Sequence, residues 1–210
     1  MADLLINSFV VFFVVIDLIG LAAIFAALTR GYTTYQRRRA ALRGVVLSTA
    51  ILVFFFFAGD WFLSAMGIEV AAFRMAGGLL LLLLSIDMVF ARQSGLRSTT
   101  SGEVAEAEVR EDISVFPLAF PLIAGPGALT TVLLMTAQPG GVAVSSLMLG
   151  IILLVLAITW VMLLFAEQLS RVLGETGTNM VSRVLGVVLA ALAVQFMIDG
   201  LHGAFPAAPA

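Results

Sequence analysis

The chain has 210 residues, of which 61% are hydrophobic and 11% are charged. This composition lies far outside the range of a water-soluble domain, and it excludes soluble enzymes, nucleic-acid binders and disordered tails. Cysteine is absent and the single histidine is His202, so thiol chemistry, disulfides and His/Cys metal sites are excluded too. We therefore predict an integral membrane protein that is not an enzyme.

Apolar runs long enough to cross a hydrocarbon core of about 30 Å recur along the chain. The runs are continuously apolar and do not alternate, which favours helices over a β-barrel. The first run lacks a basic start and a cleavage pattern, so it is interpreted as a retained helix. We predict an all-α integral membrane protein with six transmembrane helices, at residues 6–29, 44–66, 74–91, 114–137, 143–166 and 184–203.

Arginine supplies every basic charge, because the chain contains no lysine. All arginines except Arg74 fall in the connections that follow the first, third and fifth runs. The positive-inside rule places these connections in the cytoplasm. Both termini are therefore expected outside the cytoplasm.

Residues 92–113 are polar and rich in Ser, Thr and Gly, and they are interpreted as a cytoplasmic linker. The linker separates a first three-span repeat, residues 1–91, from a second, residues 114–210. We expect its acids to form a short surface helix at about residues 102–112 or no regular structure, and we assign them no chemical role. These acids are Glu103, Glu106, Glu108, Glu111 and Asp112.

The third and sixth runs begin alike, with an RxxG pattern at Arg74 and Gly77 and again at Arg183 and Gly186. Because each half holds three spans, an odd number, the second half must enter the membrane from the opposite side. The expected fold is two inverted three-helix repeats with broken helices near the midplane, an arrangement typical of transporters. Chance recurrence of Arg and Gly at helix starts is the alternative.

The segment Phe116–Thr131 reads FPLAFPLIAGPGALTT and must lie at membrane depth. Pro121, Gly125, Pro126 and Gly127 oppose a continuous helix there, because proline removes a backbone donor and glycine permits unusual dihedrals. Broken backbone is stable in lipid only where protein buries it or where it lines a cavity. We expect a half-helix that begins at Gly127 and whose amides suit a carboxylate. A proline kink without a ligand is the alternative.

Apart from Asp60 near the outer end of the second span, three acids fall within predicted spans. Asp17 lies near the middle of the first, where a charge costs at least ~2.5 kcal/mol, so it should face a polar cavity, be protonated or cap a helix break before Gly20. Its functional interpretation is binding of a substrate ammonium or a coupling cation. Asp87 and Asp199 lie nearer helix ends, where solvated or structural roles are at least as well supported as ion coupling.

The stretch EDISVFPLAFPLIAGPGALTTVLL, residues 111–134, resembles the PLAxPLxAGPGAITT signature of the MarC family of six-span bacterial inner membrane proteins. AFRMAGGLLLLL at 72–83 and SRVLGVVLAALAVQ at 182–195 extend the resemblance over essentially the whole chain. The first span of the family usually carries DPxGNxPxF. At the corresponding positions this chain has Asp17, Leu18, Gly20, Leu21, Ala23 and Phe25, without the prolines or the asparagine. If the break depends on those prolines, this first span is more regular.

The resemblance implies a secondary transporter of small neutral amino acids or similar zwitterions, of the SnatA type, working by alternating access in the bacterial inner (plasma) membrane. The coupling ion would be H⁺ or Na⁺, with no cofactor and no nucleic-acid partner, in a lipid environment and with a homo-oligomer left open. The runner-up is an exporter of drugs or other metabolites, because the family is also associated by name with antibiotic resistance. An intramembrane enzyme and a non-transporting scaffold are further alternatives, the enzyme disfavoured by the absence of HExxH and GxSxG.

The sequence assigns a substrate site between the first and fourth spans. Its expected substrate-binding residues are Asp17, Gly20, Pro121, Gly125, Pro126, Gly127, Thr130 and Gln195. The expected ion-coupling residues are Asp17, Asp87 and Asp199.

Overall fold

The computed structural model describes residues 2–90, 113–136 and 141–205, and this part of the chain is helical without any strand. Its α-helices are α1 (Ala2–Ile16), α2 (Leu18–Leu28), α3 (Thr34–Ala65), α4 (Val70–Phe90), α6 (Pro126–Thr136), α7 (Gly141–Leu164) and α8 (Ala166–Ala204). Between α4 and α6 lies a π-helical segment, Ser114–Ile123, which we call the wide coil. The predicted all-α fold is confirmed. The expected linker helix lies outside the described residues.

The number of spans agrees with the prediction. Within the described residues, five helical stretches are long and apolar enough to cross a membrane, with α1 and α2 counted together as one. The wide coil and α6 form a bent pair that makes a sixth span when the two are taken together. The chain is therefore an integral membrane protein with five to six candidate spans.

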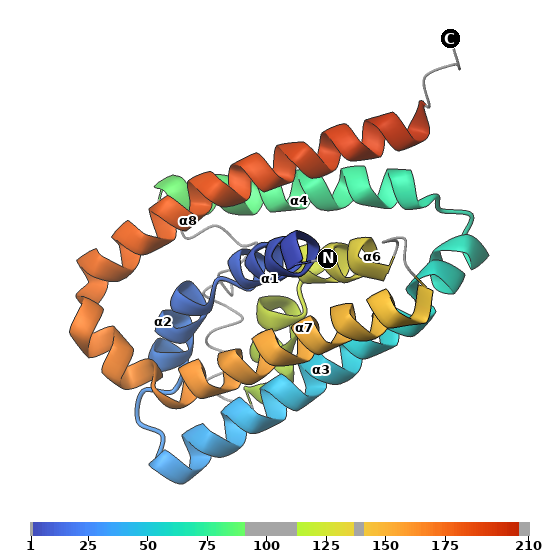
Figure 1. Cartoon of the computed structure of the whole chain (residues 1–210). Helices are drawn as coiled ribbons and strands as arrows, with labels where there is room; N and C mark the ends of the chain where they lie inside the picture. The colour runs from blue at the N-terminus through green and yellow to red at the C-terminus, as the bar shows by residue number, and fades with distance from the viewer. Residues whose placement is uncertain (1, 91–112, 137–140, 206–210) are drawn as a thin grey trace.

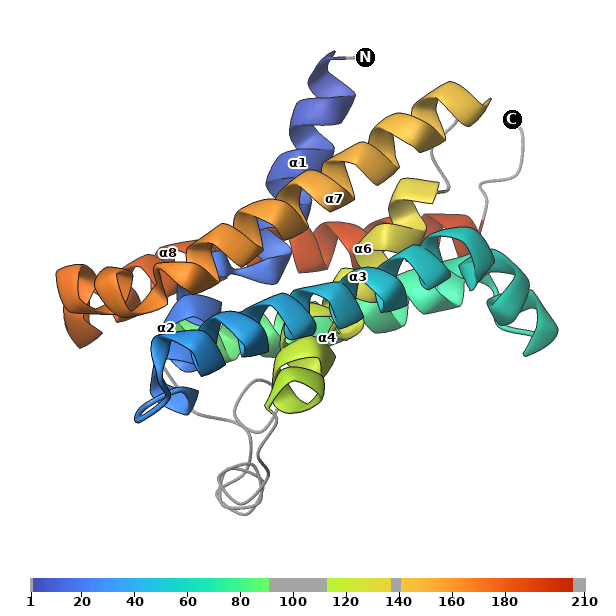
Figure 2. The same ribbon diagram turned by 90° about the horizontal axis from the view of Figure 1, so that it is seen from below.

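Two antiparallel helix pairs form the outside of the molecule. In Figure 1, α4 and α8 run side by side along the upper edge, and α3 and α7 run side by side along the lower edge. The shorter elements α1, α2 and α6 lie between the two pairs in this view. The perpendicular view in Figure 2 shows that the first turns of α1 project beyond the long helices. The long helices thus flank the two spans that are interrupted.

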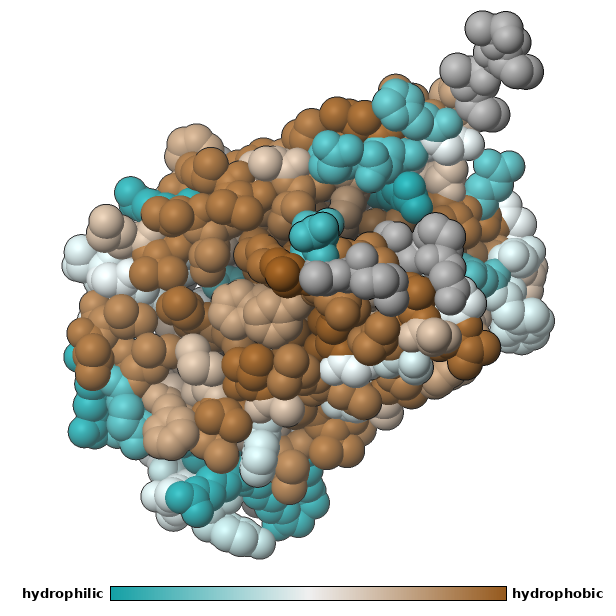
Figure 3. All heavy atoms as spheres, viewed as in Figure 1, coloured by the Kyte–Doolittle hydropathy of each residue, from teal (hydrophilic) through white to brown (hydrophobic). Residues whose placement is uncertain are grey.

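The outer surface is that of a membrane protein. Figure 3 shows a broad apolar face with polar residues gathered toward its ends. Large side chains on this surface, such as Phe57 and Val187, are well exposed. Because a soluble monomer seldom exposes apolar patches of this extent, lipid tails are the expected neighbours of these side chains.

Glycines allow α4 and α8 to approach closely. A Cβ at Gly78 would lie 2.8 Å from the carbonyl oxygen of Ala193 and 2.7 Å from Cγ of Met197. A Cβ at Gly186 would lie 2.9 Å from Cβ of Met88. Small residues at a helix interface are the usual means of tight packing in membranes, where lipid provides no hydrophobic force between helices.

Two helices are longer than hydropathy predicts. The helix α3 begins at Thr34, well before the apolar run, because a capping box holds its first turn: Gln36 N–H donates to Thr33 Oγ1 at 3.3 Å, and Thr33 N–H donates to Gln36 Oε1 at 2.9 Å. The helix α8 begins at Ala166, directly after α7, and bends at Gly174, whose φ is 61°. The third predicted connection is therefore helical.

An ion cluster joins the starts of α3 and α8. Arg37 and Arg171 both bind the carboxylate of Glu167. The hydrogen bond and charge of Arg37, with the charge of Arg171, hold the pKa of Glu167 below its usual value. The cluster places the first and third predicted connections at one end of the molecule, as the arginine pattern requires. The side of the membrane that this end faces stays a prediction.

The close packing of α4 on α8 predicts opposite effects for the same substitution at two glycines. Gly78→Ala should destabilise the protein by about 1–3 kcal/mol, because the new methyl meets backbone atoms that cannot move aside easily. Gly150→Ala in α7 should be neutral or stabilising by about 0.5–1 kcal/mol, because nothing lies within 4 Å of its Cβ and alanine favours helix. Unfolding in detergent micelles measures both. Equal effects would contradict the packing.

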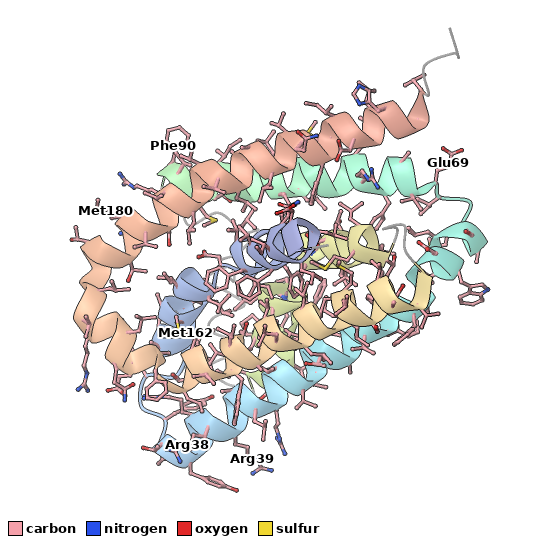
Figure 4. All side chains as sticks on the ribbon, viewed as in Figure 1. Arg38, Arg39, Glu69, Phe90, Met162 and Met180 are labelled. Carbon is pink, nitrogen blue, oxygen red and sulfur yellow. The ribbon has the colours of Figure 1, made fainter. Side chains whose placement is uncertain are left out.

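The ion cluster predicts a pH-dependent stability difference. Because the pKa of Glu167 is lowered in the folded protein, its contribution is present above the ordinary glutamate pKa and is lost as pH falls through the folded value. Glu167→Gln should therefore lower the melting temperature at pH 7, and the difference from wild type should vanish in acid. Glu69→Gln, at an exposed position beyond this cluster, serves as the control (Figure 4). A difference that stays constant with pH would contradict the assignment.

Candidate functional site

The first span is broken at Asp17. Asp17 has φ 49° and ψ 67°, a left-handed conformation that separates α1 from α2. The N–H of Gly20 donates to Asp17 Oδ1 at 3.2 Å, so the carboxylate caps α2. The break does not depend on the prolines of the family pattern, because aspartate reaches the left-handed region more easily than most residues. The predicted capping of a break by Asp17 is confirmed.

Gly20 leaves room for this cap. A Cβ at Gly20 would lie 2.3 Å from Asp17 Oδ2, so any larger residue would push the carboxylate away. Asp17 and Gly20 are the two polar or flexible residues that remain of the DPxGNxPxF pattern. They act together as one structural unit at the break.

The fourth span is broken more strongly. Its first part, Ser114–Ile123, is a wide coil in which Leu118 N–H donates to Ile113 O at 3.3 Å and Ala124 N–H donates to Ala119 O at 2.9 Å. Each of these bonds reaches five residues back, instead of the usual four. The coil and α6 meet at an angle of 55°. The predicted break is confirmed, and the half-helix begins one residue before Gly127, at Pro126.

Gly125 and Pro126 suit the turn that they make. A Cβ at Gly125 would lie 2.3 Å from the carbonyl oxygen of Pro121, so the chain can pass this close to itself only with glycine. The oxygen of Gly125 accepts the first hydrogen bond of α6, from Leu129 N–H at 3.0 Å. Pro126 is the first helical residue, where the missing N–H costs nothing.

A hydroxyl from α3 supports the irregular backbone. Ser48 is fully buried, and its hydroxyl lies 2.8 Å from the oxygen of Gly44 and 3.3 Å from the oxygen of Ala119 in the wide coil. Backbone carbonyl groups in hydrocarbon need hydrogen-bond donors from the protein, because no water is available there. The sequence interpretation missed Ser48. Its signal was a hydroxyl one turn after Gly44 within an apolar run.

The two breaks lie close together. A Cβ at Gly127 would lie 2.3 Å from Cδ2 of Leu81 in α4 and 3.5 Å from Cγ1 of Val15 in α1. Val15 is two residues before Asp17, whose side chain is 1% exposed. The start of α6 therefore packs between α1 and α4, beside the break of the first span. The break of the first span and the break of the fourth span therefore lie next to each other, as the sequence predicts for the site.

The other predicted residues lie elsewhere or have local partners. The hydroxyl of Thr130 is buried, donates to Pro126 O at 2.9 Å and packs against Gly77 of α4. Gln195 is exposed on α8, and its amide donates to Asp199 Oδ1 at 2.7 Å. Asp87 is half-buried in α4. Gln195 and Asp199 thus pair with each other on the outer face of one helix.

The comparison with known proteins bears on the whole of this architecture. The family model described as MarC family integral membrane protein matches residues 2–205. The chain belongs to the MarC family. Among relatives, the UPF0056 membrane protein YvbG of Bacillus subtilis is 34% identical over 98% of both chains.

Further relatives of this MarC family member come from distant organisms. The UPF0056 membrane protein MJ1677 of Methanocaldococcus jannaschii is 36% identical over 91% of this chain and 93% of its own. The UPF0056 membrane protein YhcE of Escherichia coli is 31% identical over 94% of this chain and 92% of its own. No solved structure matches the chain.

The cap at Asp17 predicts different effects for two substitutions. Asp17→Asn should keep most of the stability, because asparagine also accepts at an N-cap and tolerates the left-handed conformation. Asp17→Ala should cost about 1–3 kcal/mol, the sum of a lost cap and a strained dihedral. Unfolding in micelles measures both, with the exposed Asp60→Ala as control. Equal losses for Asn and Ala would contradict the capping role.

Proposed function

We propose that this MarC family protein is a secondary transporter that moves a small neutral amino acid or a similar zwitterion across the inner membrane by alternating access. One observation carries the proposal: the left-handed, buried Asp17 lies two residues from the Val15 side chain that borders the start of α6. An acid and a helix N-terminus at one place in a membrane protein suit the two charges of a zwitterion.

The start of α6 would hold the carboxylate. The first amides of a helix have no acceptor within it. At α6 these are the amides of Gly127 and Ala128, since Pro126 has no N–H and Leu129 donates to Gly125. The helix dipole adds positive potential at this end. Leu81 Cδ2 lies 2.3 Å from where a Cβ of Gly127 would stand, so a small anionic group would reach these amides when Leu81 moves aside.

Asp17 would meet the ammonium group or the coupling ion. The cap uses one carboxylate oxygen, Oδ1, for Gly20 N–H. A carboxylate at this depth is costly unless it has charged or polar partners, so it marks a functional place in the membrane. If the Asp17 carboxylate binds the coupling ion, that ion is H⁺ or Na⁺.

The packing of the helices supports two inverted repeats. Let the wide coil correspond to α1, α6 to α2, α7 to α3 and α8 to α4. The packing of α2 on α8 then corresponds to that of α6 on α4, and the packing of α1 on α7 corresponds to that of the wide coil on α3. The pairs α4–α8 and α3–α7 correspond to themselves. Two halves that make corresponding contacts can exchange their conformations, and such an exchange would open the site to one side of the membrane and then to the other.

A counterflow assay in liposomes tests the proposal. Liposomes loaded with unlabelled alanine should accumulate labelled alanine when they contain the wild-type protein. Asp17→Asn should abolish uptake while it keeps the cap, and the exposed Asp60→Asn should leave uptake unchanged. Gly127→Leu should also abolish uptake, because the new side chain fills the start of α6.

Three outcomes would overturn the proposal. They are no uptake by folded wild-type protein, unchanged uptake by both Asp17→Asn and Gly127→Leu, and loss of uptake only where unfolding measurements show loss of the fold. The alternative of a drug exporter would instead predict a change in drug susceptibility of a deletion strain without any amino acid counterflow.

A further inference from the structure

The first turns of α3 project beyond its apolar part. Thr34 begins the helix and Gly44 begins the apolar run, so the turns between them carry Arg37, Arg38 and Arg39. Arg37 is turned toward Glu167 of α8. Arg38 and Arg39 are exposed, and Figure 4 shows both directed away from the bundle at the lower end of α3.

The exposed arginines lie on the same face as an apolar stripe. Residues three, four and seven positions apart share one side of a helix. Arg38 and Arg39 are followed on this side by Leu42 and Val46, which are 49% and 56% exposed. The stripe continues to Phe57, which is 71% exposed. The outer face of α3 is thus cationic at its start and apolar along the rest of its length.

The stretch of sequence that contains the start of α3 carries basic residues without acids. No acid occurs between Asp17 and Asp60, a stretch that contains Arg30, Arg37, Arg38, Arg39 and Arg43. Glu167 of α8 is already shared by Arg37 and Arg171. The positive end of the α3 dipole adds to the potential. An anion is therefore favoured beside Arg38 and Arg39.

We propose that Arg38 and Arg39 form a binding site for the phosphate of an anionic phospholipid, whose acyl chains lie along Leu42 and Val46. Guanidinium groups bind phosphate oxygens through paired, charge-assisted hydrogen bonds. The apolar stripe starts one turn from the arginines, so a bound headgroup and its chains follow the same helix face. Tyr35, 71% exposed on this face, lies at the headgroup level where aromatic rings are favoured.

The apolar stripe distinguishes a lipid from a soluble phosphate. A free phosphate would use the arginines alone, and it would leave Leu42 and Val46 without a role. Each basic residue next to a membrane span strengthens binding to anionic lipid roughly fivefold. The site is independent of the proposed substrate, because α3 presents this face away from α1 and α6.

Lipid titration of the full-length protein tests the assignment. The protein, purified in detergent, is titrated with phosphatidylglycerol, with phosphatidylcholine of the same chains and with glycerol phosphate, and bound species are counted by native mass spectrometry. The wild type should retain phosphatidylglycerol at least tenfold more tightly than phosphatidylcholine. Arg38→Gln with Arg39→Gln should lower that affinity by roughly 20-fold.

A second pair of substitutions is the matched control. Arg171→Gln with Arg183→Gln removes the same charge from exposed positions of α8 outside the proposed site, and should lower the phosphatidylglycerol affinity clearly less than Arg38→Gln with Arg39→Gln does. Equal retention of both lipids, equal loss in the two double variants or equally tight binding of glycerol phosphate would each overturn the assignment. Because Arg38 and Arg39 are exposed, their double variant should keep the wild-type melting temperature within a few degrees. The control variant loses one of the two arginines that bind Glu167, so its melting temperature is measured on the same preparations before the lipid affinities are compared.

Discussion

Backbone groups in hydrocarbon have no water to bind, so a helix can break inside a membrane only where protein surrounds the break. Both interruptions of this chain meet that condition. Asp17 and Ala124 are buried, and the antiparallel pairs α3–α7 and α4–α8 enclose the elements that contain them. The residues at the two breaks are surrounded by protein, although other side chains of the short elements, such as Phe120, are exposed on the outer surface.

The same constraint explains the small and polar residues on the enclosing helices. Gly44 admits Leu118 of the wide coil, and Ser48 lies near the Ala119 oxygen that this coil presents. Gly77 admits Thr130. These contacts stabilise the broken fourth span from α3 on one side and α4 on the other. They also account for polar side chains that an apolar chain would otherwise not contain at these depths.

The sequence predicts the break in the fourth span because proline and glycine alter the backbone wherever they stand. It predicts the break in the first span less well. The residue type of Asp17 indicates a cap but not its left-handed conformation, and the absence of the family prolines left open whether the span is broken. Helix ends were also misplaced: the polar turns from Thr34 and from Ala166 are helical, although hydropathy alone records only the apolar runs. Gln195 and Asp199 are four residues apart on one helix and pair there. Whether this pair faces the interior depends on how α8 is rotated, which the pattern of that run does not fix.

The central claim is that the breaks of the first and fourth spans meet inside the protein. The chain has no cysteine, so a Val15→Cys, Gly127→Cys pair can be introduced alone, with Leu81→Ala in all variants to make room. Mild oxidation in native membranes should cross-link this pair, whereas Val15→Cys with Gly150→Cys should not cross-link, since Gly150 faces open space. Cross-linking of the first pair no greater than that of the second would contradict the account.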